Sequence, residues 1–372
     1  MAESFDVAII GAGPAGSAAA IELGTLGLSA ILVDRSDFVT RRVGEHLNPQ
    51  GVKTLEDLGW RLDCHLDLAR EGTVVCSAWE SSSPVVSSYL FNPLGAGLNL
   101  SRPAFEKSLH AIAKERGAVV QLETNVLGLH QLNDEWLMQL RSLDQSREVR
   151  AKFLIDATGW KASMARRLGA KRHVEDTLVC FHAVFGGMPR SLTAKHETEA
   201  LIIESHDQGW CYSVGLPTSK GSYSIACGYL VDLATAASSK PNPGKWLSNR
   251  LSTIPLTAER VAGMELSTVK IELCPSQMLE PSSGKGWLAI GDAASCFDPL
   301  ASEGIAKALK TGREAGHLAR LVLTANRDSP SSQSDVEATR HAAFAKYSTE
   351  RKQLYKKVCR WPDSRFWQNR AE

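Results

Sequence analysis

The sequence has almost no net charge and no long apolar segment. Its 42 Lys and Arg residues nearly balance 41 Asp and Glu residues over 372 positions, so the formal charge is +1. Proteins that bind nucleic acid or anionic membranes carry an excess of positive charge. No apolar run approaches the roughly 18 residues that are needed to cross a bilayer. We therefore expect neither nucleic acid nor a membrane as a partner.

The eight cysteines lack the spacing of a metal or redox site. No two of them form a Cys-x-x-Cys pair, and histidines do not cluster near them. This excludes the usual zinc and thioredoxin-type patterns, so we expect no bound metal and mostly buried thiols in a reducing compartment. The first strand would begin at Phe5, which leaves no room for a signal or transit peptide. We expect a cytoplasmic protein.

One dinucleotide motif is present, and no second Gly-x-Gly-x-x-Gly follows another strand. Residues 5–16 read FDVAIIGAGPAG, an apolar strand that leads into a glycine turn and a helix of small residues. Gly11 permits the tight turn, Gly13 lets phosphates approach the backbone, and Gly16 allows close helix packing. Asp34 ends the next strand, 23 residues after Gly11, near the spacing expected of a carboxylate that binds ribose hydroxyls. The segment therefore predicts a pyrophosphate site.

Two later segments indicate which dinucleotide is bound. Residues 285–309 read KGWLAIGDAASCFDPLASEGIAKAL: a strand, a Gly-Asp turn, a Pro-containing loop and a helix from about residue 302. Residues 151–163 read AKFLIDATGWKAS, a buried strand that ends in Asp-x-x-Gly. With the N-terminal motif, they resemble the para-hydroxybenzoate hydroxylase superfamily of FAD enzymes, which includes aromatic monooxygenases, tryptophan halogenases and geranylgeranyl reductases. The resemblance covers roughly residues 1–330.

The resemblance implies a set of FAD contacts. Asp292 would accept hydrogen bonds from the ribityl chain, and Pro299 would lie against the isoalloxazine ring. The helix that starts near Gly304 would direct its positive end at the pyrimidine edge, where reduced flavin is anionic. Arg102 matches a superfamily position before a helix; the alternative is a solvated charge. The expected FAD-binding residues are Gly11, Gly13, Ala15, Gly16, Asp34, Arg35, Arg42, Arg102, Asp292, Pro299, Gly304 and Ile305.

The loop after the second strand, which contains RRVGEHLNP, runs over the flavin toward the substrate in the superfamily. Arg41 and Arg42 could contact FAD phosphate or ribityl oxygens, and Glu45 and His46 could reach the active site. Histidine can serve as an acid or base near neutral pH, which makes His46 the catalytic candidate. The alternative is that His46 only anchors the loop to a backbone carbonyl.

The predicted fold is α/β: a Rossmann-like FAD-binding domain with an inserted antiparallel-sheet substrate domain. Residues 74–91 alternate in the manner of an antiparallel excursion, and a second excursion, from about 177 to 271, carries short strands and one helix near Trp246. The expected domains are FAD binding at 1–75, 98–170 and 275–330, a capping sheet at 76–97 and 171–274, and a C-terminal helical tail at 331–372.

Halogenase features are missing from this sequence. Halogenases carry a Trp-x-Trp-x-Ile-Pro box, but residues 210–217 read WCYSVGLP, with Tyr212 in place of the second Trp and Pro217 two residues late. Residues 91–97, FNPLGAG, offer no Lys to capture or guide hypohalous acid. We expect no halogenation, and we expect Trp210 and Tyr212 to be core or pocket-wall aromatics.

The closer resemblance is to the LodB/GoxB flavoproteins. It rests on the GEHLNP loop, the missing halogenase Lys and the FW-x-x-R ending at residues 366–370. These proteins assist formation of cysteine tryptophylquinone in a partner amine or amino-acid oxidase, and a related flavoprotein of quinohemoprotein amine dehydrogenase hydroxylates a tryptophan. The resemblance implies a monooxygenase-like enzyme that hydroxylates a tryptophan in the precursor of a quinone-cofactor oxidase, with O2 as co-substrate.

Other functions stay open on the sequence alone. The enzyme alternatives are a monooxygenase of a free small aromatic and an isoprenoid reductase. A non-catalytic flavin-binding partner that stabilises an enzyme precursor is the third. The electron donor is unknown: either a nicotinamide binds transiently beside the flavin, or electrons come from elsewhere. A protein substrate would require an open groove at the flavin, bounded by the strands near Val85 and the sheet of residues 177–271.

Overall fold

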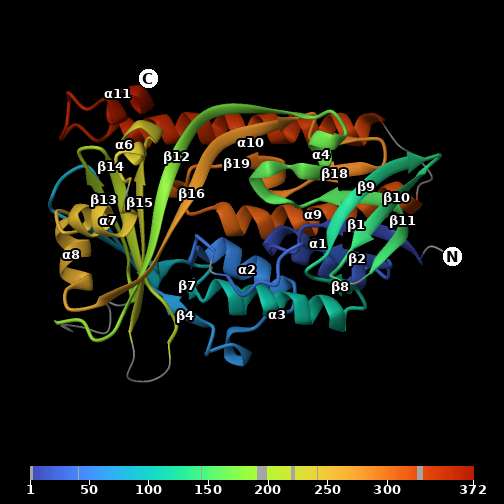
Figure 1. Ribbon diagram of the computed structural model, residues 1–372, viewed down its shortest axis with the longest axis horizontal. Coiled ribbons are helices and arrows are strands. Elements are labelled where there is room, and N and C mark those ends of the chain that lie inside the picture. The colour runs from blue at the N-terminus through green and yellow to red at the C-terminus, as the bar shows by residue number, and fades with distance from the viewer. Residues whose placement is uncertain are drawn as a thin grey trace.

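The computed structural model describes residues 3–40, 42–143, 145–190, 199–218, 223–240, 242–324 and 330–372. Two large sheets lie side by side, and a long C-terminal helix runs along the top of both (Figure 1). The sheet on the right in Figure 1 contains the N-terminal strand, and the sheet on the left contains most of the inserted residues. The predicted combination of a Rossmann-like domain and an antiparallel sheet is confirmed.

The first sheet has the order β17-β18-β11-β1-β2-β8, with β10 and β9 added to β11. Strands β18, β11, β1, β2 and β8 run parallel. Residues 7–10 of β1 are buried because both faces are covered, one by helices and the other largely by side chains of β9 and β10, which explains their continuous apolar run. The strands are β1 (Glu3–Ile10), β2 (Ala30–Val33), β8 (Val119–Gln121), β9 (Asn125–Leu132), β10 (Glu135–Arg141), β11 (Ser146–Asp156), β17 (Ser283–Gly284) and β18 (Trp287–Ala289).

Helices α1 (Pro14–Thr25) and α9 (Gly304–Thr324) pack closely beside this sheet. Their contact uses small residues: a Cβ on Gly312 would collide with Ala15 O, and one on Gly316 would crowd Glu22. Small side chains bring the two backbones together at the glycine turn. The other helices of this half are α2 (Pro49–Asp57), α3 (Arg102–Glu115) and α4 (Ser163–Arg167), with short 3₁₀ turns η1 (Leu62–Cys64), η3 (Gly159–Lys161), η4 (Gly291–Ala293) and η5 (Pro299–Ala301).

The second sheet, called the cap sheet below, has the order β19-β16-β12-β15-β14-β13-β5-β6. All its pairs are antiparallel except β13 with β5. The longest strands, β12 and β16, join the two halves, and β16 continues to residue 280, past the expected boundary at 275. Its strands are β5 (Val74–Ala78), β6 (Val85–Ser88), β12 (Lys171–Gly186), β13 (Leu201–His206), β14 (Gly209–Gly215), β15 (Ser224–Val231), β16 (Glu265–Glu280) and β19 (Ser295–Cys296).

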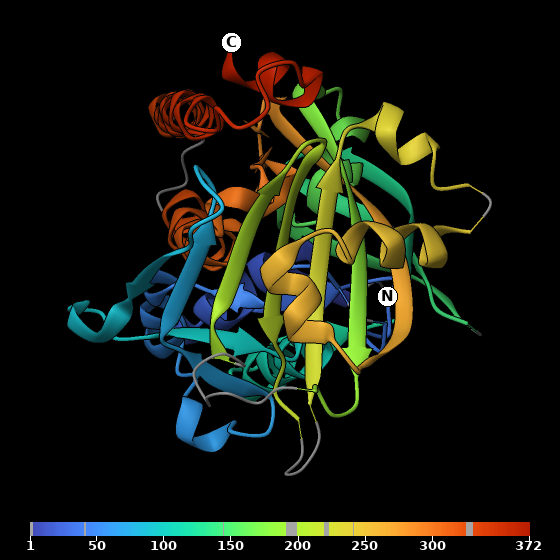
Figure 2. The same cartoon turned by 90° about the vertical axis from the view of Figure 1, so that its left-hand side faces the viewer.

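Among the described residues, the helices α6 (Leu233–Ala237), α7 (Pro243–Leu251) and α8 (Pro255–Val261) accompany the cap sheet, where the sequence predicted one near Trp246. Helices α7 and α8 lie across its outer face (Figure 2). Asp232 and Asn242 cap the first two through their side chains, and proline starts the last two, so each short helix has a local start signal. Helix α7 contains Trp246, whereas α6 and α8, with 5 and 7 residues, are too short to show helical periodicity in the sequence.

A small third sheet connects the two halves below the cap. It has the order β3-β7-β4, formed by β3 (His46–Leu47), β7 (Gly97–Leu100) and β4 (Ala69–Gly72). The turn η2 (Tyr89–Phe91) lies between β6 and β7 and exposes Leu90 and Phe91. This sheet brings the loop that precedes His46 against the cap sheet.

The C-terminal tail forms α10 (Pro330–Lys356) and α11 (Arg365–Ala371), which pack on the cap sheet. Trp367 Nε1 donates to His206 O at 2.9 Å, and Arg370 donates to both oxygens of Asp176 at 2.7 and 2.9 Å. Phe366, Trp367 and Arg370 are all buried. The FW-x-x-R ending is therefore part of the hydrophobic core of the cap.

Two kinds of feature, a membrane-spanning helix and a metal-binding cluster, are absent from the described residues. No helix in them combines the length and apolar character needed to span a bilayer. Within the same residues, no group of three His, Cys, Asp or Glu side chains has the arrangement of a metal site.

Candidate active site

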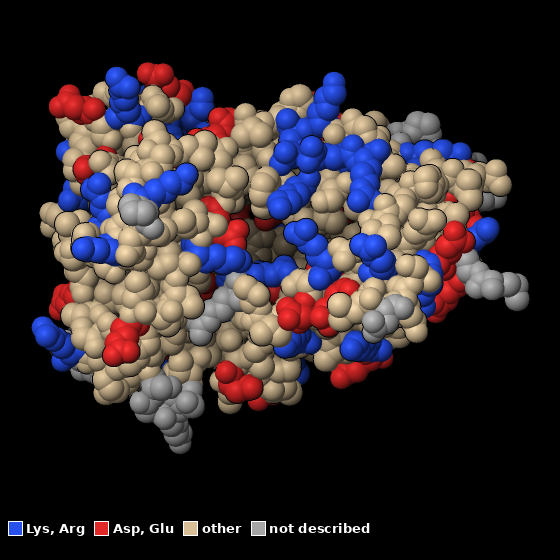
Figure 3. Space-filling view, in the orientation of Figure 1, with Lys and Arg blue, Asp and Glu red and all other residues tan. Residues whose placement is uncertain are grey.

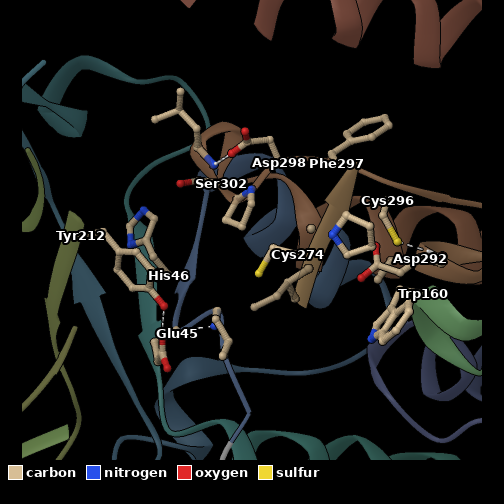
Figure 4. A pocket seen from close by; sticks show the side chains of 18 of the residues that line it. Glu45, His46, Trp160, Tyr212, Cys274, Asp292, Cys296, Phe297, Asp298 and Ser302 are labelled. Carbon is tan, nitrogen blue, oxygen red and sulfur yellow. Dashed lines mark hydrogen bonds between the residues drawn. The ribbon is translucent and has the colours of Figure 1, made fainter. Parts of the chain in front are cut away.

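A cavity of about 280 Å³ lies between the two large sheets (Figure 4). The cap contributes apolar side chains to its wall, including Leu201, Ile203 and Trp210, and α9 contributes Gly304 and Ile305. The volume is just below the range for small-ligand sites, which runs from roughly 300 to 1,000 Å³. The cavity can hold an aromatic ring in surroundings that largely exclude water.

The glycine turn leaves space where a phosphate would bind. A Cβ on Gly11 would collide with the backbone of Ala157, and one on Gly16 would collide with Gly11 O. At Gly13, among the described residues, the only neighbour of such a Cβ within 4 Å would be Arg42 Nη1, at 3.8 Å. Gly11 also has a φ of +106°, which only glycine adopts readily. Two glycines thus permit the fold, while Gly13 keeps the ligand space open beside the α1 N-terminus.

Asp34 is held rigidly beside that turn. Its Oδ2 accepts the Ala12 N–H at 2.7 Å, and its Oδ1 accepts the Ser36 N–H at 2.8 Å. Each carboxylate oxygen keeps a further lone pair, so the predicted ribose contact stays a prediction. Arg35 is exposed and lines a separate surface depression with Glu123 and Arg141, away from the cavity.

Arg102 is buried at the start of α3 and lines the cavity. It donates from Nη1 to Val43 O at 2.6 Å and to Gly44 O at 2.8 Å, and from Nη2 to Glu106 at 2.5 Å. The alternative of a solvated charge is therefore wrong. Its Nε has no hydrogen-bond partner among the described residues, so one buried donor is available to a ligand. Arg102 holds the loop of residues 43–44 in place, and its predicted FAD contact stays a prediction.

Arg42 is about one-third exposed near the glycine turn. Its Nε lies 3.6 Å from Glu106 Oε2, and its guanidinium carbon lies 4.1 Å from the centre of the Phe38 ring. This geometry leaves part of its donor set directed to solvent or a ligand, since a guanidinium has five N–H groups. Arg41 lies outside the described residues.

The residues that were predicted to lie near the flavin ring line the cavity. Asp292, Pro299, Gly304 and Ile305 all line it, whereas Ala15 is buried in the contact between α1 and α9. A Cβ on Gly304 would meet no atom within 4 Å, so the N-terminus of the 21-residue helix α9 is open toward the cavity. The partial positive charge there favours an anionic ring edge.

Asp292 and Asp298 place two carboxyl groups at the end of the cavity near Pro299 and Gly304. Asp292 Oδ1 lies 3.1 Å from Lys307 Nζ, and its side chain is about half exposed. Asp298 is buried, donates its backbone N–H to Tyr347, and accepts from Leu300 N and the Tyr355 hydroxyl. Burial raises the pKa of Asp298 despite these bonds. Tyr355 comes from α10, so the tail fixes the loop that carries Pro299.

His46 lines the cavity from β3 and is buried. Its Nδ1 lies 2.8 Å from the Asn99 side-chain oxygen, and Asn99 donates its amide N–H to Glu199 O. The contact is thus to a side chain rather than to a backbone carbonyl. Burial lowers the pKa of His46 more than the Asn99 bond raises it, so the ring is neutral near pH 7. Its Nε2 has no partner among the described residues, and its catalytic role stays a prediction.

Glu45 is the centre of a buried group of polar side chains. The sequence predicted that Glu45 could reach the active site, but it did not indicate His182 as its partner. Its Oε1 lies 2.5 Å from His182 Nε2, and its Oε2 accepts the Tyr212 hydroxyl at 3.1 Å (Figure 4). Burial raises the pKa of Glu45, but the charges of His182 and Arg102 and the hydrogen bonds from His182 and Tyr212 outweigh it, and the net shift is downward. The sequence signal for His182 was a polar residue inside the apolar strand VCFHAVF.

Known proteins match this chain in sequence and in fold. A family model described as an FAD binding domain matches residues 4–360. The chain belongs to this family. Its cofactor is FAD, and the open space at Gly13, the unpaired Arg102 Nε and the α9 N-terminus all suit that molecule. This flavoprotein is an FAD-dependent oxidoreductase of the monooxygenase type.

Relatives of this flavoprotein include a protein of Marinomonas mediterranea named FAD-dependent oxidoreductase LodB. It is 28% identical, and the match covers 99% of this chain and 97% of that protein. The flavin-dependent halogenase CmlS has a similar structure, with a TM-score of 0.82, 25% identity, and coverage of 100% of this chain and 68% of that one. The peptidyl tryptophan dihydroxylase QhpG, described as essential for tryptophylquinone cofactor biogenesis, has a TM-score of 0.77, 21% identity, and coverage of 99% and 79%.

Proposed function

We propose that this flavoprotein hydroxylates a tryptophan side chain in the precursor of a quinone-cofactor oxidase during cysteine tryptophylquinone formation. The observation that carries the proposal is the end-to-end correspondence with LodB, which spans 99% of this chain and 97% of its relative. The FW-x-x-R ending, on which the sequence resemblance to the LodB/GoxB flavoproteins partly rests, is packed into the cap. The fold shared with QhpG also supports the proposal.

The residues of the cavity suit this chemistry. Bound FAD supplies the activation of O2 for attack on an electron-rich ring. The apolar cap wall excludes water and holds the ring in place, which favours reaction by orientation. The N-terminus of α9 stabilises negative charge at the ring edge nearest Gly304. No metal ligand is required for any of these roles.

A protein substrate needs access from the surface. Figure 3 shows a hollow at the centre of this face, between the two halves of the molecule, with Lys and Arg side chains around it. The cap contributes β13 and β14 to the cavity wall through Leu201, Ile203 and Tyr212, whereas the strands near Val85 do not line it. A tryptophan on an exposed segment of the partner can approach through such an opening.

The test is co-expression with a candidate precursor oxidase from the neighbourhood of this gene, followed by intact-mass analysis of that oxidase. The proposal predicts added oxygen in the oxidase with the wild-type flavoprotein and none with the Gly13→Val variant, which cannot hold FAD. Modification by both proteins would show that flavin is not needed and would favour a non-catalytic stabilising partner. An unmodified oxidase in the presence of wild-type protein, with turnover of a free aromatic or isoprenoid instead, would overturn the proposal.

A further inference from the structure

The hydrogen bonds around Glu45 have a fixed direction. A carboxylate has no proton to give, so it accepts from both neighbours: His182 donates Nε2–H, and Tyr212 donates its hydroxyl proton. Glu45 and His182 are both at least nine-tenths buried, which protects this arrangement from exchange with water. Glu45 comes from the loop before β3, His182 from β12 and Tyr212 from β14. Three separate parts of the fold therefore fix the orientation of the hydrogen bonds that join Glu45 to His182 and Tyr212.

The direction of the hydrogen bond from Tyr212 to Glu45 determines whether the Tyr212 hydroxyl can donate or accept a hydrogen bond on the cavity side. A tyrosine hydroxyl has one proton and two lone pairs. Because the proton points at Glu45, the oxygen presents only acceptor capacity to other partners. Tyr212 lines the cavity, and Figure 4 shows its hydroxyl and Glu45 together on one wall. Leu201, Ile203 and Trp210 make the cap side of the wall apolar. The wall thus combines one hydrogen-bond acceptor with an apolar surface.

An indole has the complementary character. Its nitrogen is a donor only, and the rest of the ring is apolar. We propose that the Tyr212 oxygen accepts the indole N–H of the substrate tryptophan, and that Glu45 and His182 are positioning residues that keep it an acceptor. This assignment rests on the proposed function and specifies its substrate. An apolar wall with one hydrogen-bond acceptor favours a ring that carries an N–H over a ring of the same shape that lacks one.

The test compares two ring probes, indole and benzofuran, on the FAD-loaded protein by titration of the flavin absorbance. Benzofuran has the shape of indole but no N–H. The wild type should bind indole about tenfold more tightly, which is the effect of one hydrogen bond. Tyr212→Phe should remove this preference by weakening indole binding while benzofuran affinity stays the same. FAD content and the thermal midpoint establish that each variant is folded.

Tyr229→Phe is the matched control. Tyr229 is a buried tyrosine of the adjacent strand β15, its hydroxyl lies 3.5 Å from His206 Nδ1, and it packs in the cluster on the outer face of the sheet. This variant should keep the full preference for indole. Glu45→Gln is a second test, because an amide N–H can donate to the Tyr212 oxygen and turn its proton toward the cavity. The preference for indole should fall in that variant as well.

Equal affinity of the wild type for the two probes, binding of neither, or an unchanged preference in Tyr212→Phe would each overturn the assignment. The proposed function fails separately. If the wild type prefers indole and loses this preference in Tyr212→Phe, yet the co-expressed oxidase gains no oxygen, the N–H acceptor stands and the partner is wrong. If the oxidase is modified but the probes are not distinguished, the function stands and the role of Tyr212 is wrong.

Discussion

At the residue scale, the three glycines of the N-terminal turn have different tasks. Gly11 and Gly16 are surrounded by protein atoms, so a side chain at either would disturb the fold itself. Gly13 has ordinary φ and ψ and open space above it, so a side chain there would enter only the ligand volume. Loss of FAD and loss of folding can therefore be separated at this turn.

We predict that Gly13→Val abolishes FAD binding and leaves the fold intact. The added isopropyl group occupies the space of the phosphates, while the backbone at Gly13 is extended and tolerates valine. Flavin absorbance of the purified protein and circular dichroism measure the two properties. Gly186→Val is the control, because Gly186 also faces open space but lies in the cap, and it should keep normal flavin content. Normal flavin content in Gly13→Val would contradict the assignment of the turn.

His46 should make the apoprotein less stable in mild acid. Burial lowers its pKa in the folded state below the usual value of about 6.5, so the unfolded chain binds a proton more readily. Stability is then lost as pH falls below 6.5 toward the folded pKa. His46→Gln should lose less unfolding free energy than the wild type between pH 7 and 5, as measured by urea denaturation. Parallel pH profiles for the two proteins would show that His46 does not titrate in this way.

At the scale of elements, the tail is joined to the cap by an ion pair between a buried arginine and a partly buried aspartate. Arg370 of α11 donates two hydrogen bonds to Asp176 of β12, and the Arg370 side chain is 6% exposed. Arg351 of α10 lies 3.3 Å from the same carboxylate. Tyr355 of α10 then contacts Asp298 in the loop before Pro299. The tail therefore holds in place the loop of Asp298 and Pro299, which lines the cavity.

Removal of this ion pair should destabilise the whole protein. Arg370→Met removes two hydrogen bonds to the partly buried Asp176, which keeps Arg351 and the Thr177 N–H as partners, so we expect a cost of roughly 2 kcal/mol in the free energy of unfolding. Arg365→Met is the control on the same helix, because Arg365 is exposed, and it should change stability by less than about 0.5 kcal/mol. Denaturant unfolding of the two variants makes the comparison. Equal stability would show that α11 is only a surface attachment.

The sequence predicted the elements whose signals are local. The strand, turn and helix at residues 5–25 follow from one continuous motif, and the short apolar run VCFHAVF predicted a cap strand. The pairing of Glu45 with His182 could not be predicted, because the two residues lie 137 positions apart and no periodicity connects them. The sequence predicted an FAD contact for Arg102 but left a solvated charge as the alternative, because its partners Val43 O and Gly44 O are backbone atoms of a distant loop.

At the scale of the whole molecule, electrons must reach the flavin without a dedicated nicotinamide domain. Among the described residues, β1 and α1 form the one strand, glycine turn and helix of the dinucleotide type. We predict no rapid, saturable reduction of the flavin by micromolar NADPH when substrate and partner are absent. Stopped-flow absorbance measures this directly. Fast reduction of the isolated protein would reveal a nicotinamide site outside this motif.

The central claim is that this flavoprotein oxidises a tryptophan in a partner oxidase. The most direct measurement is the intact mass of that oxidase from a strain that lacks this gene, with the wild type or Gly13→Val restored from a plasmid. The account predicts an inactive oxidase without added oxygen in the deletion strain, recovery with the wild type, and no recovery with Gly13→Val. An oxidase that carries its full quinone mass in the deletion strain would contradict the account.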